Sequence, residues 1–198
     1  MVSTDGVVRP ASEYLEMTNE YVVGKGTSKY CKLSRESFAV GALARFNNSH
    51  GCLHTEASEV AADLGLEPVC HNPFMNNAAR VVECVHATLE AIRLIDVLTA
   101  PGDQGPARAD FNPGVGVGVG VVEAPRGILY HCYEYDADGR VVKADCVIPT
   151  TQNHANIQHD LDDLVPQFVS DTMTDEDLEL LCSMLVRSYD PCISCSVH

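Results

Sequence analysis

The last nine residues, 190–198, constrain the fold of this chain more than any other segment. They place Cys192 and Cys195 three residues apart, directly after Pro191, and the sequence stops at His198. A Cys-x-x-Cys turn lets two thiolates bind one metal centre or exchange as a redox pair. Because Pro191 fixes its own φ and disfavours helix at the residue before it, a preceding helix should end there. We therefore expect the cysteines to lie on a stiff, anchored turn.

Composition favours a cytoplasmic globular protein. The 198 residues are 45% hydrophobic, which is enough for a single domain, 1–198, with its own core. A net charge of -15 argues against nucleic acid or an anionic membrane as partner. No apolar run approaches the ~20 residues of a membrane helix, so we expect no membrane insertion. The nine scattered cysteines and the absence of a signal-like start predict reduced, mostly buried thiols in the cytoplasm.

Local patterns predict a mixed fold in which helix exceeds strand. The predicted helices are 56–64, 75–99, 156–169 and 174–188, and the predicted strands are 127–135 and 140–148. Thr55 should cap the first helix, Pro166 should interrupt the third, and Thr174 with Asp177 forms a capping-box variant for the fourth. We therefore expect an α+β, mainly helical class, with long helices in a bundle beside a small antiparallel sheet built on the hairpin.

The segment 114–121 alternates glycine with valine. Alternating glycine is typical of a strand or loop that other backbone approaches closely. As a phosphate-binding loop it is a poor candidate, because no strand precedes it and no helix clearly follows. We expect it to join the small sheet.

Four segments together resemble nickel–iron hydrogenase large subunits. Residues 190–198 are similar to the family's C-terminal Asp-Pro-Cys-x-x-Cys-x-x-His signature. In the family's order, 72–76 resemble its mid-chain segment, 123–127 (Glu-Ala-Pro-Arg-Gly) its active-site arginine loop, and 149–153 (Pro-Thr-Thr-Gln-Asn) its Pro-Ser/Thr-Thr-x-Asn loop. The motifs are closest to the soluble, cofactor-coupled, cytosolic branch. The likeness extends over nearly the whole chain.

The resemblance implies a nickel–iron centre whose iron carries cyanide and carbonyl ligands. Cys192 would be a terminal nickel thiolate and the first proton acceptor, and Cys195 would bridge nickel and iron. Soft, anionic sulfur suits nickel and tolerates its redox changes. Arg126 would lie above the open metal position as a rival proton acceptor, although an arginine rarely deprotonates and an electrostatic role suits it better. Asp190 would hold Arg126 by a charge-assisted pair.

The same resemblance implies further contacts to the metals. Thr150 and the backbone of Pro125 and Arg126 would contact the cyanide ligands, and His198 would bind a magnesium ion near the C-terminus.

Each assignment has a simpler alternative. The cysteine pair could be a structural zinc half-site or a surface redox pair, although the sequence offers no second Cys-x-x-Cys and no close histidine pair to complete a zinc site. Arg126 could be a surface salt-bridge partner, Asp190 a helix cap and Thr150 a turn hydroxyl. His198 could be a disordered terminus. His131 fits a strand residue at a subunit contact better than a metal ligand.

The match departs from the family's N-terminal region. The other Cys-x-x-Cys, in an Arg-x-Cys-Gly-x-Cys motif, is absent. The glutamate that relays protons from the terminal nickel thiolate and an acidic magnesium ligand from the same region are missing too. The chain thus resembles the C-terminal half of a large subunit, and two thiolates do not hold a dinuclear site that uses four. One hypothesis is a split [NiFe] hydrogenase that cleaves H2 reversibly and heterolytically to protons and electrons. A second polypeptide would bring the missing cysteine pair, an iron–sulfur small subunit would carry electrons, and further subunits could reduce NAD(P) or another electron carrier.

The other hypothesis is a non-catalytic, truncated homologue that acts as a structural or interaction subunit. Both hypotheses predict an obligate partner and a long exposed apolar face on the chain taken alone.

Overall fold

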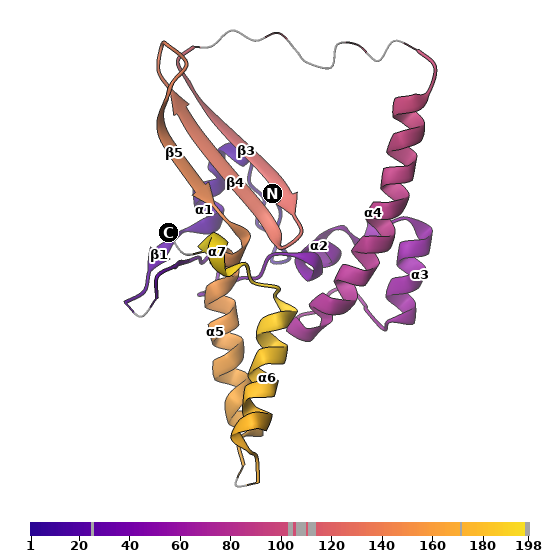
Figure 1. Ribbon diagram of the computed structural model, residues 1–198, viewed down its shortest axis with the longest axis vertical. Coiled ribbons are helices and arrows are strands. Elements are labelled where there is room, and N and C mark those ends of the chain that lie inside the picture. Colours follow the sequence, from indigo (N-terminus) through magenta and orange to yellow (C-terminus); the bar gives the residue numbers. More distant parts are fainter. Residues whose placement is uncertain (25, 103–104, 106–109, 111–113, 171, 197–198) are drawn as a thin grey trace.

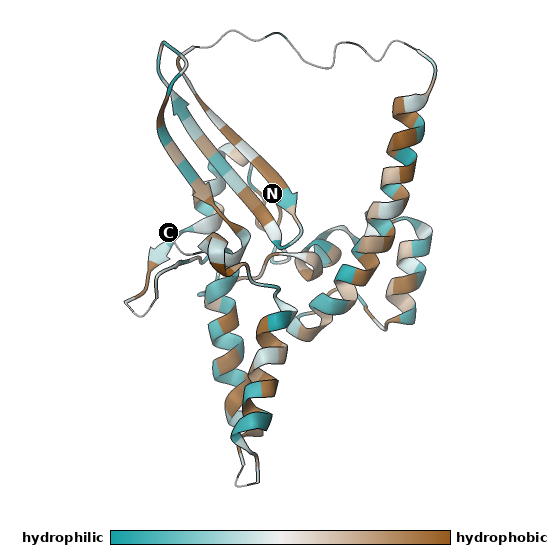
Figure 2. Ribbon diagram, viewed as in Figure 1, coloured by the Kyte–Doolittle hydropathy of each residue, from teal (hydrophilic) through white to brown (hydrophobic). Residues whose placement is uncertain are grey.

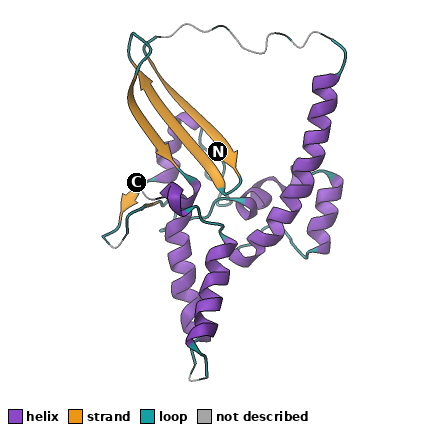
Figure 3. Cartoon of the chain, in the orientation of Figure 1, coloured by secondary structure: helices purple, strands orange, loops and turns teal. Residues whose placement is uncertain are grey.

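The computed structural model describes residues 1–198 except 25, 103–104, 106–109, 111–113, 171 and 197–198. The elements in chain order are η1 (Ala11–Glu13), α1 (Tyr14–Thr18), β1 (Tyr21–Val22), β2 (Lys29–Tyr30), α2 (Ala42–Ser49), η2 (His50–Cys52), α3 (Thr55–Asp63), η3 (Pro73–Met75), α4 (Asn76–Thr99), β3 (Gly116–Ala124), β4 (Gly127–Tyr135), β5 (Val141–Val147), α5 (Pro149–Phe168), α6 (Asp175–Ser188) and α7 (Ile193–Ser196). Helix exceeds strand, as predicted (Figure 3). The mixed helix-and-strand class is therefore confirmed.

The elements radiate from a common centre. The three-stranded sheet and the far end of α4 project to one side, while α5 and α6 run side by side in the other direction (Figure 1). α2 and α3 pack against α4, whereas α6 meets that group through η3. The long helices therefore form two groups, not the one bundle that the sequence suggested.

The sheet has the antiparallel order β3-β4-β5, so the predicted hairpin is confirmed and β4 lies in the middle. The Gly-Val segment is its edge strand, in register with β4 as Gly118↔Tyr133 and Gly120↔His131. A Cβ atom built on Gly116, Gly118 or Gly120 would meet nothing within 4 Å. The close backbone approach that the glycines suggested is thus not made by the described residues of this chain.

The buried apolar residues form two clusters, one between α2, α3 and α4 and one between the sheet and the N-terminal segment. The first cluster comprises Ala42, Leu43, Phe46, Ala57, Ala61, Leu66, Ala79 and Val82. In the second, Tyr14, Cys31, Tyr130 and Val147 are buried, and the Tyr14 and Tyr130 rings stack at 5.6 Å. The phenol of Tyr14 also donates to the carboxylate of Asp145 on β5. This second cluster fixes the sheet to the start of the chain.

One of the two predicted helix N-caps is confirmed and the other is wrong. α6 has the full capping box, in which the Asp177 N–H donates to the Thr174 hydroxyl at 3.1 Å and the Thr174 N–H donates to the Asp177 carboxylate at 3.3 Å. At α3, however, the N-cap is His54, and the helix begins at Thr55 without a side-chain cap.

Helix α5 is longer than predicted at its start. It begins at Pro149 instead of 156, because a proline in the first helical position already has a helical φ and lacks only an N–H that no helix would use. Pro166 lies in the last part of α5 and does not interrupt it, and Val169 N–H still donates to Val165 at 3.0 Å. The segment 149–153 is therefore the first turn of a helix and not a loop.

The surface is unusually large for the mass. The chain exposes 12605 Å², whereas a compact monomer of 21.4 kDa exposes roughly 9,100 Å². Several large apolar side chains are exposed, and Figure 2 shows hydrophobic residues along the free end of α4. The exposed apolar side chains there are Ile92, Leu94, Ile95, Val97 and Leu98, between 43% and 66% exposed. The predicted long apolar face is thus present.

The cysteines follow the same trend. Among the free thiols, only Cys31 is buried, whereas Cys52 and Cys84 are exposed. The prediction that most would be buried was wrong, because the chain exposes more surface than a compact monomer of its mass.

In the described part of the chain, no helix is both long and apolar enough to traverse a bilayer.

Candidate metal centre

The cysteine turn follows directly from the end of α6. The helix ends at Ser188, and Asp190 adopts a left-handed φ of 51°, which reverses the chain before Pro191. The Cys195 N–H then donates to the Cys192 carbonyl at 3.2 Å, which closes a tight turn. The two Cα atoms are 5.3 Å apart, and the two sulfur atoms are joined as a disulfide. The prediction of reduced thiols is therefore wrong for this pair, whereas the other cysteines are free. Both sulfurs therefore point to one place, as two thiolates on one metal would.

Arg126 lies on the turn between β3 and β4 and contacts the residue that begins the cysteine turn. Its Nε donates to the backbone carbonyl of Asp190 at 2.7 Å and lies 3.2 Å from the Asp190 carboxylate. The two side chains remain 41% and 46% exposed. An exposed ion pair alone contributes little, but the additional backbone bond fixes where the guanidinium sits. The structure thus brings the predicted pair together beside the cysteines.

The first turn of α5 holds three other segments in place. The Thr150 hydroxyl accepts the Cys192 N–H at 3.0 Å, and the Gln152 amide donates to the Ile128 carbonyl at 2.7 Å. The Asn153 amide pairs with both backbone groups of Val40, at 2.8 and 3.1 Å. All three polar side chains are buried. Of these, only Thr150 was predicted; Gln152 and Asn153 belong to the same five-residue motif, which is the signal that could have identified them.

Two glycines let the Arg126 turn approach the segment before α2. Gly127 has a φ of +139°, and a Cβ there would lie 2.8 Å from the Val40 Cβ. Gly41 has a φ of +118°, and a Cβ there would lie 3.1 Å from the Arg126 carbonyl oxygen. Both positions favour glycine because L side chains rarely adopt such backbone angles. The turn is thus held by close backbone packing.

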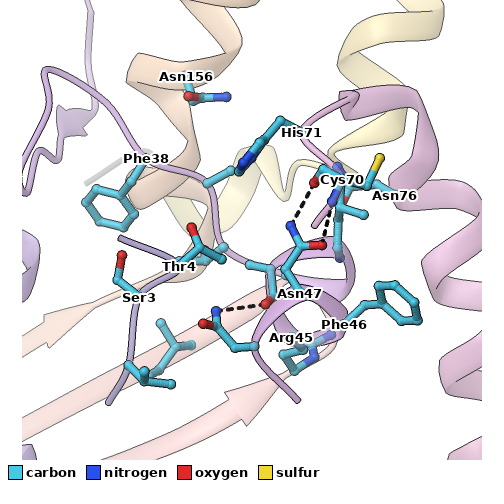
Figure 4. Close-up of a pocket in the computed structure, with 18 of the residues that line it drawn as sticks. Ser3, Thr4, Phe38, Arg45, Phe46, Asn47, Cys70, His71, Asn76 and Asn156 are labelled. Carbon is cyan, nitrogen blue, oxygen red and sulfur yellow. Dashed lines mark hydrogen bonds between the residues drawn. The ribbon is translucent and has the colours of Figure 1, made fainter. Parts of the chain in front are cut away.

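A cavity of about 1060 Å³ lies between the N-terminal segment, α2 and the residues around Cys70. Figure 4 shows the Asn47 amide bound to both backbone groups of Cys70, at 2.7 and 3.0 Å, on one wall. Tyr189 also lines the cavity, but Arg126, Cys192 and Cys195 do not. The cavity is therefore separate from the cysteine turn.

The donor set of this chain fits half of a dinuclear thiolate site. Cys192 and Cys195 provide two convergent sulfurs, which soft metals prefer. No cluster of three or more histidine, cysteine or acidic side chains suited to a metal occurs among the described residues. His198, the predicted magnesium ligand, lies outside the described residues. Further thiolates must therefore come from elsewhere if this turn holds nickel and iron.

Pro125 and His131, also considered in the sequence analysis, make hydrogen bonds within the chain. Pro125 precedes Arg126 on the same turn, and its carbonyl accepts a hydrogen bond from Arg45 at 3.0 Å. His131 lies on β4, where its Nδ1 contacts the Tyr133 hydroxyl at 2.8 Å and the Cys146 sulfur at 3.4 Å. No metal-binding cluster includes His131 in the part of the chain that is described.

Comparison with known proteins identifies the family. The model of the nickel-dependent hydrogenase family matches residues 12–198. The alpha chain of sulfhydrogenase 1 from Pyrococcus furiosus is 36% identical over 197 residues, which is 99% of this chain and 45% of that protein. The beta chain of the NAD-reducing hydrogenase HoxS from Cupriavidus necator is 33% identical over 123 residues, 62% of this chain and 25% of that protein. The chain therefore belongs to the nickel-dependent hydrogenase family, as the motifs predicted.

A solved structure has a similar fold. This chain aligns over its whole length with the crystal structure of an NAD+-reducing [NiFe]-hydrogenase in the H2-reduced state, with a TM-score of 0.79 and 25% sequence identity. The match spans 49% of that other chain. This sequence thus spans less than half the length of each of these relatives.

Proposed function

We propose that this chain supplies the C-terminal half of the catalytic subunit of a [NiFe] hydrogenase, which cleaves H2 reversibly to protons and electrons. One arrangement carries the proposal. Three motifs that lie far apart in the sequence meet at the cysteine turn, where Arg126 binds Asp190 and Thr150 binds Cys192. A scaffold that had lost the reaction would have no chemical need for this set.

In this proposal Cys192 and Cys195 would be the thiolates that this chain gives to the nickel–iron centre. Thr150 and the Pro125–Arg126 backbone would contact its cyanide and carbonyl ligands, and His198 would hold magnesium. When bound, the nickel–iron centre would supply the redox chemistry and the open position at which H2 reacts.

The chain's own residues have distinct tasks. With the Cys192–Cys195 disulfide reduced, the Cys192 thiolate would accept the proton, and the hydrogen bond from its backbone to Thr150 would hold it in place. Arg126 would act electrostatically, through the delocalised positive charge of its guanidinium. Asp190 orients Arg126 through its carboxylate and its carbonyl.

The proposal requires other polypeptide to complete the site. The second cysteine pair comes from residues outside this sequence, and an iron–sulfur small subunit carries electrons, with NAD(P)- or other carrier-reducing subunits beyond it. The excess surface of roughly 3,500 Å² is on the scale of obligate interfaces and supports such partners. We place the complex in the cytoplasm, where thiols stay reduced.

The test is to purify the native complex through a tag that leaves His198 free, then measure its metals and its infrared spectrum. We expect nickel and iron at about one each per complex, with bands in the cyanide and carbonyl region. Cys192→Ser should lose nickel, whereas Cys84→Ser, an exposed thiol on α4, should retain it. Intact mass distinguishes a second chain with the other cysteine pair from a longer single chain.

Two results would overturn the proposal. Zinc alone on Cys192 and Cys195 would make the turn a structural site. An intact native complex without nickel and without the infrared bands would make this chain a non-catalytic, structural or interaction subunit.

A further inference from the structure

Arg45, on the first turn of α2, joins three elements through its guanidinium. Its Nε and Nη2 donate to the two carboxylate oxygens of Glu83 on α4, at 2.5 and 2.8 Å. Its Nη1 donates to the Glu123 carboxylate at the end of β3, at 2.8 Å. The fork geometry of a guanidinium makes such bidentate binding possible, and a lysine could not reproduce it.

The same guanidinium also binds two consecutive backbone carbonyls. Nη1 donates to the Ala124 carbonyl at 2.8 Å, and Nη2 donates to the Pro125 carbonyl at 3.0 Å. These are the two peptide groups directly before Arg126. Arg45 therefore binds the backbone directly before Arg126, where the turn between β3 and β4 approaches the cysteine turn.

The protein environment stabilises the protonated form of Arg45. Its side chain is only 20% exposed. Burial tends to lower the pKa of its guanidinium, but the hydrogen bonds to Glu83 and Glu123 outweigh burial and raise the pKa above its ordinary value. Arg45 thus stays protonated in the folded protein at neutral pH.

Ion pairing alone does not explain this arrangement. Glu83 and Glu123 would neutralise a cation at many positions, whereas the two carbonyl contacts require the guanidinium to lie in one place beside the turn. The N-terminal end of α2 also helps to position the turn, because Gly41, the N-cap residue, packs against the Arg126 carbonyl. Figure 4 shows Arg45 beside Asn47, on the wall of the cavity that α2 shares with the N-terminal segment.

We propose that Arg45 is a positioning residue for the hydrogenase reaction, acting through the Ala124–Pro125 carbonyls to set the orientation of Arg126 at the metal centre. This inference rests on the proposed function. It does not require Arg45 to touch substrate or metal. It assigns a role to a residue that no motif in the sequence marked.

The test compares Arg45→Lys with Arg9→Lys in the native complex. Arg9 forms an exposed ion pair with Glu16 in the N-terminal segment, and none of the described hydrogen bonds of its side chain reaches the turn, so its variant is the control. Arg45→Lys should retain nickel and iron but shift the cyanide bands of the infrared spectrum. Its kcat should fall by about 100-fold with KM little changed, because a small misplacement of a catalytic group acts on the transition state.

Hydrogen exchange gives a readout that needs no metal. Amides of the 124–130 segment should exchange faster in Arg45→Lys than in Arg9→Lys, while those of α6 should not differ. If Arg45→Lys does not assemble, Glu83→Gln weakens the anchor of the same guanidinium and should change the bands and the exchange in the same direction.

The outcomes separate the two proposals. Unchanged bands, exchange and kcat in the Arg45→Lys complex would overturn the positioning role while leaving the hydrogenase assignment intact. A wild-type complex without nickel and iron would overturn the hydrogenase assignment and with it a role in that reaction, and faster exchange in the variant would then show that Arg45 holds the turn for stability alone.

Discussion

The hydroxyl of Thr150 accepts a hydrogen bond from the backbone N–H of Cys192, 3.0 Å away, across 42 positions of sequence. The bond links the first turn of α5 to the residue that would be the terminal nickel ligand. Thr150 is 3% exposed, so water does not compete for the bond. The position of the first thiolate is thus set by a helix that contains no cysteine.

Replacing Thr150 by valine keeps the shape of the side chain and removes the acceptor. The Cys192 N–H would then lack its partner, at a cost of about 1–3 kcal/mol in the free energy of unfolding. We expect a lower urea midpoint and less nickel per native complex. Thr150→Ser retains the hydroxyl and should resemble the wild type; equal behaviour of the two variants would refute the role of this bond.

Gly127→Ala should disrupt the Arg126 turn. The new Cβ would meet Val40, and the φ of +139° is one that alanine rarely adopts. We expect a loss of at least about 1–2 kcal/mol in stability, together with a displaced Arg126. Thermal unfolding and hydrogen exchange of residues 124–130 measure both effects. Gly118→Ala is the control, because a Cβ there meets open space; a similar loss in both variants would contradict this account.

The free end of α4 should be a binding surface and not a source of stability. Ile95 and Leu98 are 58% and 66% exposed, so Ile95→Glu with Leu98→Glu should leave the unfolding of the isolated chain unchanged. Recovery of the tagged chain in the native complex should instead fall, since burial of each side chain contributes about 1.5–3 kcal/mol and the pair at least a 100-fold change in affinity. A control double variant on α3, Glu56→Lys with Glu59→Lys, should assemble normally. Normal assembly of the α4 variant would show that this face has no partner.

Acid should weaken the fold through His154. Burial lowers the pKa of this imidazole, despite a hydrogen bond to the Lys29 backbone that acts in the opposite direction. Because the unfolded chain then binds the proton more readily, the free energy of unfolding is at its full value above about pH 6.5 and falls as the pH decreases below it.

The measurement for His154 is urea unfolding at pH 7.5 and pH 5.5. His154→Asn removes the titrating group, so its stability should depend less on pH than that of the wild type. His71→Asn, at an exposed position, serves as the control and should keep the wild-type dependence. An equal pH dependence in wild type and His154→Asn would rule out this contribution.

Local signals in the sequence predicted the local structure well. The three- and four-residue spacing of apolar residues predicted α4 almost to its ends, because one face of its first half packs on α2 and α3. Thr174 with Asp177 predicted the start of α6, and Pro191 predicted where it stops. These features depend on neighbours within a few residues, which a sequence displays directly.

Long-range features were missed. Pro149 opens a helix, yet the motif it belongs to was expected to be a loop. The carbonyl contacts of Arg45 span about 80 positions and leave no local signature. The glycines of β3 suggested a close neighbour that the described residues of this chain do not provide. The Arg45 contacts and the open side of β3 depend on which distant segment arrives at a site, and a single sequence does not state that. The start of α5 at Pro149 was instead a local signal that the prediction overlooked.

The exposed free end of α4 also bears on the life of this polypeptide after synthesis. A helix whose apolar side chains lie open is a substrate for chaperones and proteases until something covers it. Free copies should therefore be degraded while assembled copies persist. The amount of this protein in a cell would then follow the supply of whatever binds α4, and expression without it should lower the yield of intact chain.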